Sequence, residues 1–83
     1  MASLRVTVRL SGTMAQRLGS RRSVELGSGA VVNDLVVELA REAGFDPAAL
    51  RGLAVVASGD FVSRDRPLAD GDELDVLVPV AGG

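Results

Sequence analysis

The chain has 83 residues, of which 47% are hydrophobic and 24% are charged, and its net charge is −2. These values predict a single globular domain with a modest core, and the acidic charge and the lack of Tyr and Trp argue against nucleic-acid binding. No apolar run approaches the roughly 20 residues of a membrane span, and the N-terminus lacks a secretory signal, so we expect a cytoplasmic protein with no membrane partner.

Three residue types that enzymes often use for catalysis, Cys, His and Lys, are missing. The sequence contains no Cys and no His, and each of its nine basic residues is Arg rather than Lys. A thiolate nucleophile, a zinc-thiolate site, an imidazole base and a Schiff-base amine are therefore all excluded. We expect a protein that is not itself an enzyme.

The first third of the chain predicts two strands with a short helix between them. Residues 4–10 alternate apolar and polar side chains, which is typical of a half-buried strand. Residues 13–18 form a helical turn or two that ends at Gly19. A second short strand covers residues 23–26 and ends at the turn Gly27-Ser28-Gly29.

A longer helix is predicted over residues 32–43. Its apolar residues recur at a spacing of three and four, so they form one buried stripe, and Asp34 suits the positive end of the helix dipole. Val31 stands at the capping position and offers no side-chain acceptor, so we expect the first turn to fray. The residues of the stripe are Val32, Leu35, Val36, Leu39, Ala40 and Ala43.

The second half of the chain predicts further strands. Residues 47–50 start with proline and suggest one helical turn, and the unbroken apolar run at 53–57 suggests a strand in the centre of a sheet. A turn at Ser58-Gly59-Asp60 leads into a short strand at Phe61-Val62.

The last strand begins at Glu73 and alternates strictly. Leu74, Val76 and Val78 fall on one face, and Glu73, Asp75 and Leu77 fall on the other. Pro79 has no N–H group to donate, so sheet pairing should end there. We expect a domain over residues 1–79 and a flexible tail over residues 80–83, Val80-Ala81-Gly82-Gly83.

This order of elements cannot form an all-parallel doubly wound sheet, because the first two strands are joined as a hairpin and one long helix crosses to the remaining strands. It fits an α+β protein with a mixed sheet of four to five strands and one main helix on one face. That arrangement is the β-grasp, or ubiquitin-like, fold.

The ending of the chain resembles that of the ubiquitin-like sulfur carriers. The resemblance rests on Leu68-Ala69-Asp70-Gly71-Asp72-Glu73 followed by Val78-Pro79-Val80-Ala81-Gly82-Gly83, and it is closest to the small subunit of molybdopterin synthase. It implies that Gly83 is adenylated and then converted to a thiocarboxylate. The chain itself would bind no cofactor, and ATP would be used by an activating enzyme related to those of ubiquitin.

The same resemblance implies two kinds of partner, the adenylating enzyme and an acceptor that consumes the sulfur, such as the large subunit of molybdopterin synthase. Leu77 is an apolar residue on an otherwise acidic strand face, next to the tail, and this favours a contact with a partner. The partner-binding residues that we assign are Gly82, Ala81, Val80, Pro79, Leu77 and Phe61.

Several alternatives remain open. The acidic residues Asp70, Asp72, Glu73 and Asp75 are interpreted as a solvated turn and strand face rather than a metal site, because a calcium loop has a different spacing. Residues 55–62 replace the Val-Asn-Gly-Glu turn of the family with a turn that we expect to be longer and that lacks Asn. The sulfur could serve thiamine, cysteine or another thio-metabolite, or the domain could be a ubiquitin-like interaction module whose tail is never activated.

Overall fold

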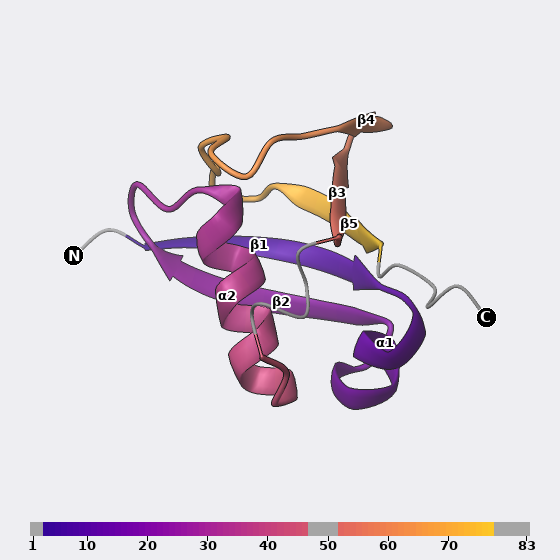
Figure 1. Ribbon diagram of the computed structural model, residues 1–83. Helices are drawn as coiled ribbons and strands as arrows, with labels where there is room; N and C mark the ends of the chain where they lie inside the picture. Colours follow the sequence, from indigo (N-terminus) through magenta and orange to yellow (C-terminus); the bar gives the residue numbers. More distant parts are fainter. Residues whose placement is uncertain (1–2, 47–51, 78–83) are drawn as a thin grey trace.

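The chain forms a mixed five-stranded sheet and two helices, which confirms the predicted β-grasp architecture (Figure 1). The computed structural model describes residues 3–46 and 52–77. In chain order the elements are β1 (Ser3–Leu10), α1 (Gly12–Leu18), β2 (Arg21–Gly27), α2 (Val32–Ala43), β3 (Ala54–Ala57), β4 (Asp60–Phe61) and β5 (Glu73–Leu77).

The strands lie in the order β2-β1-β5-β3-β4. β1 pairs in parallel with β5, and the other neighbouring strands pair antiparallel. The apolar run at residues 53–57 supplies β3, which pairs with β5 on one side and with the two-residue strand β4 on the other, so it has an interior position in the sheet, as predicted. The central strand is β5, which pairs with β1 on one side and with β3 on the other. It is the last strand before Gly83 in the sequence.

The core lies between one face of the sheet and α2. The predicted stripe of α2 is buried along its whole length, as are the alternate apolar side chains of β1 and β5. Burial of each large aliphatic side chain stabilises the fold by about 1.5–3 kcal/mol, so this layer fixes which face of the sheet is covered. No helix in the ranges 3–46 and 52–77 is long and apolar enough to cross a membrane.

The first turn of α2 is closed, and the prediction that it frays is wrong. The Val31 N–H donates to Asp34 Oδ2 at 2.8 Å, so Asp34 supplies the acceptor that the Val31 side chain lacks. The next two N–H groups donate to the loop that follows β4: Val32 to the Arg66 carbonyl at 2.9 Å and Asn33 to the Arg64 carbonyl at 2.8 Å. Acceptors from the loop thus replace the missing side-chain cap.

The turn between β3 and β4 is not longer than the family's turn, which corrects the prediction. Val56 pairs with Phe61 and Ala57 pairs with Asp60, so the loop consists of Ser58 and Gly59 alone. Both have positive φ, 53° and 83°, which is the type I′ geometry that tight hairpins favour. Ser58 therefore occupies the position where that turn usually has Asn.

Candidate functional site

The candidate site lies on the face of the sheet that α2 leaves open. Along β5 the side chains of Leu74 and Val76 are buried against the core, and those of Glu73, Asp75 and Leu77 are directed to the open face, as predicted. Leu77 is the last described residue of the chain, six positions before Gly83. The open face therefore includes the last described residue before the C-terminal segment.

Four apolar residues gather at this end of the open face. Ala54 lies opposite Leu77 on β5, and Val56 lies opposite Phe61 on β4, so cross-strand pairs join the two predicted partner-binding residues through β3. Leu77 is 43% exposed and Phe61 is 75% exposed. We call this group, Ala54, Val56, Phe61 and Leu77, the apolar corner.

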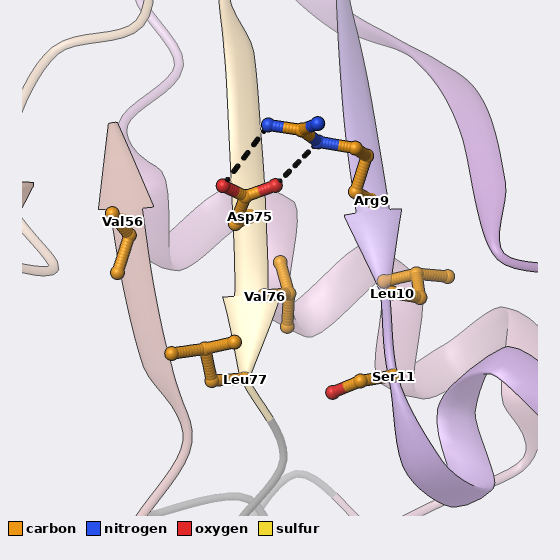
Figure 2. A pocket seen from close by; sticks show the side chains of 7 residues that line it. All are labelled: Arg9, Leu10, Ser11, Val56, Asp75, Val76 and Leu77. Atoms are coloured by element: carbon orange, nitrogen blue, oxygen red, sulfur yellow. Dashed lines mark hydrogen bonds and ion pairs between the residues drawn. The ribbon is translucent and has the colours of Figure 1, made fainter. Parts of the chain in front are cut away.

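An ion pair borders the apolar corner (Figure 2). Arg9 of β1 lies beside Asp75 of β5 in the register, and its guanidinium donates from Nε to Oδ1 at 2.6 Å and from Nη2 to Oδ2 at 3.2 Å. An exposed pair of this kind contributes about 0–1 kcal/mol to folding. Its two-point geometry fixes the guanidinium across β5, and three of the five donors of Arg9 remain for another molecule.

The ends of β1 and β5 enclose an open hollow of about 440 Å³ next to this pair. Figure 2 shows Leu10 and Ser11 on one side of β5 and Val56 on the other, with Leu77 at the end of the strand. The floor of the hollow is apolar and its rim is charged. This arrangement is more typical of a contact with another protein than of a pocket that encloses a small ligand. The lining residues are Arg9, Leu10, Ser11, Val56, Asp75, Val76 and Leu77.

The acidic residues near the last strand do not converge. In the ranges 3–46 and 52–77, no three carboxylate side chains are grouped so that they could hold a metal ion. Two of these side chains close the turn before β5 and two form ion pairs across the open face, so they are more engaged than a merely solvated surface. Their partners are the Arg5 N–H for Asp70, the Ala69 N–H for Asp72, Arg21 for Glu73 and Arg9 for Asp75.

The structure brings together some of the predicted site residues and leaves others undescribed. Leu77 and Phe61 lie on one exposed corner. The predicted tail residues Pro79, Val80, Ala81, Gly82 and Gly83 lie outside the described residues, so the assignments made for them stay predictions. Sequence reasoning missed Arg9 and Val56, because alternation assigns each to a face but does not reveal which residue of another strand lies beside it.

Comparison with known proteins places this geometry in a family. The model of the ThiS family matches residues 8–83, which include β5 and the terminal glycine pair. The chain belongs to the ThiS family. No curated protein sequence matches it.

Solved structures of other small proteins share this fold over nearly the whole length of both chains. A Pyrococcus furiosus protein assigned as molybdopterin converting factor, subunit 1, is 28% identical, with a TM-score of 0.75 and coverage of 93% of this chain and 99% of that one. Small archaeal modifier protein 1 from Haloferax volcanii is 21% identical, with a TM-score of 0.74 and coverage of 93% and 99%. Ubiquitin from Caldiarchaeum subterraneum is 16% identical, with a TM-score of 0.69 and coverage of 99% and 100%. The last two likenesses concern the fold alone.

Proposed function

We propose that this ThiS-family chain is a sulfur carrier whose C-terminal Gly83 is adenylated, converted to a thiocarboxylate and used to donate sulfur in molybdopterin biosynthesis. The observation that carries the proposal is the family match, which runs through the last strand to Gly83 itself. The 28% identity to the Pyrococcus furiosus protein assigned as molybdopterin converting factor favours molybdopterin over other sulfur-containing products.

The chemistry needs little from the carrier beyond an accessible carboxylate. A carboxylate is a poor acyl donor, so ATP first converts it to an acyl-adenylate with release of pyrophosphate. A sulfur nucleophile then attacks the carbonyl carbon, the bond to the phosphate oxygen breaks, and AMP leaves. Glycine at the end of the chain lets the backbone take conformations closed to other residues inside a narrow cleft that excludes water.

The apolar corner supplies the surface that an activating enzyme would hold. Gly83 lies six positions after Leu77, a reach of about 20 Å for an extended chain, so the enzyme could bind the open face while the tail enters its active site. Burial of Leu77 and Phe61 would provide affinity, and Arg9 with its free donors would fix the orientation. The same surface would then serve the acceptor, such as the large subunit of molybdopterin synthase.

Intact-mass spectrometry tests this proposal. The chain is incubated with ATP, a sulfur source and an adenylating enzyme encoded beside it or known to act on carriers of this family. The proposal predicts a mass increase equal to the exchange of one oxygen atom for sulfur, with no increase when ATP is omitted. An unchanged mass, with an enzyme that loads a control carrier in the same tube, would favour a ubiquitin-like interaction domain whose tail is not activated.

A further inference from the structure

One edge of the sheet is formed by a long strand. Within residues 3–46 and 52–77, β2 (Arg21–Gly27) pairs only with β1, whereas β4 at the other edge has two residues. Proteins protect sheet edges with very short strands, bulges or proline, because an unpaired edge can bind a strand of another chain. β4 is short enough to be protected. β2 contains no proline and pairs with β1 without a bulge, so its outer edge can accept a further strand.

The unpaired backbone groups of β2 belong to alternate residues. The Leu10 N–H donates to the Ser20 carbonyl at 2.9 Å, and this pair continues the register of β1 with β2. Alternation along an antiparallel pair therefore turns the N–H and C=O groups of Arg21, Ser23 and Glu25 outward, away from β1. None of these outward groups has a hydrogen-bond partner in the part of the chain that the structure describes. A strand that pairs with them breaks no backbone hydrogen bond of the monomer.

The outer strand carries charges of both signs on the open face of the sheet. Arg21 and Glu25 lie on this face, because the residues that alternate with them face the core. Glu25 accepts from Arg5 through Oε2 alone, at 3.2 Å, and Arg21 approaches Glu73 through Nη2 alone, at 3.7 Å. Each side chain thus keeps polar atoms for a further partner, and Ser23 lies midway between the two.

This spacing makes β2 complementary to a second copy of itself. When two antiparallel copies are related by a two-fold axis at Ser23, Arg21 lies directly opposite Glu25 of the second copy, and Glu25 lies opposite Arg21. An axis at Arg21, Arg22 or Glu25 sets like charges opposite each other, which is destabilising. An axis at Val24 sets no charged pair directly opposite. Charge complementarity therefore favours the axis at Ser23.

The face of β2 toward α2 is compatible with the same register. Arg22 is on this face, where its guanidinium pairs with Glu42 of α2. With the axis at Ser23, Arg22 lies opposite Val24 of the second copy, whose side chain is buried in its own core. No like charges are therefore set directly opposite each other on this face.

We propose that β2 pairs with β2 of a second copy about Ser23 and joins the two five-stranded sheets into one. The pairs Arg21 with Glu25, Ser23 with Ser23 and Glu25 with Arg21 each exchange two backbone hydrogen bonds. The contact is confined to the strand edge, so we expect a weak dimer with a Kd on the order of 0.1 mM. This inference goes beyond the carrier function and does not rest on it.

The pairing leaves the apolar corner accessible. The corner lies on β5, β3 and β4, and β1 separates β2 from these strands (Figure 1). A two-fold axis normal to the sheet turns both open faces to the same side, so the dimer presents two apolar corners, one toward each far edge. Formation of the dimer and binding of an activating enzyme are therefore separate events.

Sedimentation equilibrium of the full chain, from about 10 µM to about 1 mM, tests the proposal. The wild-type chain should pass from monomer to dimer over this range. Ser23→Pro removes the outward N–H, which the monomer does not use, and proline is tolerated at such an edge position. We expect this variant to fold and to dimerise at least about tenfold more weakly. Ser23→Ala keeps the N–H group and is the matched control, with dimerisation as in the wild-type chain. Circular dichroism shows whether each variant is folded.

Ser23→Cys tests the register without proline. The natural sequence contains no Cys, so a disulfide of this variant forms only between two copies. With the axis at Ser23 the two Cα atoms are about 5.5 Å apart, which a disulfide can bridge. With the axis at Val24 they are about 7–8 Å apart, which is too far. Under mild oxidation, Ser23→Cys should cross-link at least about tenfold faster than Ser63→Cys, an exposed control position after β4. Non-reducing gel electrophoresis measures both rates.

The outcomes decide the inference without reference to sulfur chemistry. A wild-type chain that stays monomeric at about 1 mM would overturn it. A folded Ser23→Pro variant that dimerises like the wild-type chain would also overturn it, because the interface would then lie elsewhere. Equal cross-linking of Ser23→Cys and Ser63→Cys would reject the pairing about Ser23, and this result decides alone if Ser23→Pro does not fold. None of these measurements uses ATP or an activating enzyme, so each leaves the proposed function as it stands.

Discussion

Leu77 and Val37 are two exposed aliphatic side chains with nearly equal exposure, 43% and 42%, on opposite sides of the molecule. Leu77 belongs to the apolar corner on the open face, whereas Val37 lies on the outer side of α2. Glutamate substitutions at these two positions therefore distinguish the loss of a binding contact at Leu77 from the general effect of adding a negative charge to the surface.

We predict that Leu77→Glu weakens binding to the activating enzyme about tenfold or more, because binding would bury a carboxylate in an apolar contact. Val37→Glu should bind like the wild-type chain. Isothermal titration calorimetry measures both affinities, and thermal unfolding shows that both variants are folded. Equal affinities of the two variants would remove the apolar corner from the interface.

Arg17 links the two helices through two contacts of one side chain. Its Nη1 donates to the Ala43 carbonyl at 3.2 Å, and its guanidinium carbon lies 5.1 Å from the centre of the Phe45 ring. We predict that Arg17→Ala lowers the free energy of unfolding by about 1–2 kcal/mol, since it removes both contacts. Arg41→Ala, which loses only an exposed pair within α2, should lower it by clearly less than Arg17→Ala does. Urea denaturation compares the two, and equal losses would show that the Arg17 contacts add nothing.

At the scale of elements, the turn between β3 and β4 decides where Phe61 is presented. Ser58 has a φ of 53°, which a non-glycine residue rarely adopts and which Asn tolerates better than Ser. We predict that Ser58→Asn raises the free energy of unfolding by a few tenths of a kcal/mol. Ser58→Val should lower it by about 1 kcal/mol or more, because a β-branched side chain is strained there. Chemical denaturation of both variants checks the order, and a Val variant as stable as the Asn variant would contradict the assigned turn.

The elements themselves were predictable wherever a local pattern specifies them. The alternation in β1 and β5 and the stripe of α2 need no knowledge of distant residues, and the structure confirms these faces. The closure of α2 by the carbonyls of Arg64 and Arg66 was not predictable, because residues more than 30 positions apart supply the partners. β2 extends over Arg21–Gly27, beyond the predicted 23–26, because pairing with β1 recruits residues that have little strand preference alone. The position of Arg9 over Asp75 likewise depends on a parallel register that the sequence does not encode locally.

At the scale of the whole molecule, the fold and the reactive end should be separable. The described core ends at Val76 and involves no residue after it, so changes beyond Gly83 should leave the packing intact. We predict that a single alanine appended after Gly83 abolishes sulfur loading while the melting temperature changes by no more than about 1 °C. Both glycines remain in this variant, but the Gly83 carboxylate becomes an amide. Loading at the wild-type level, with trimming of the added residue excluded by mass, would show that Gly83 is not the functional group.

The most direct measurement locates the sulfur atom. After incubation with ATP, the sulfur source and the activating enzyme, trypsin should release the peptide Asp65–Gly83, since Arg66 precedes proline and resists cleavage. The account predicts that tandem mass spectrometry finds the oxygen-to-sulfur exchange in the fragment ions that contain Gly83 and in none that lack it. An unmodified Asp65–Gly83 peptide, in a reaction that loads a control carrier, or sulfur placed on any other residue, would contradict it.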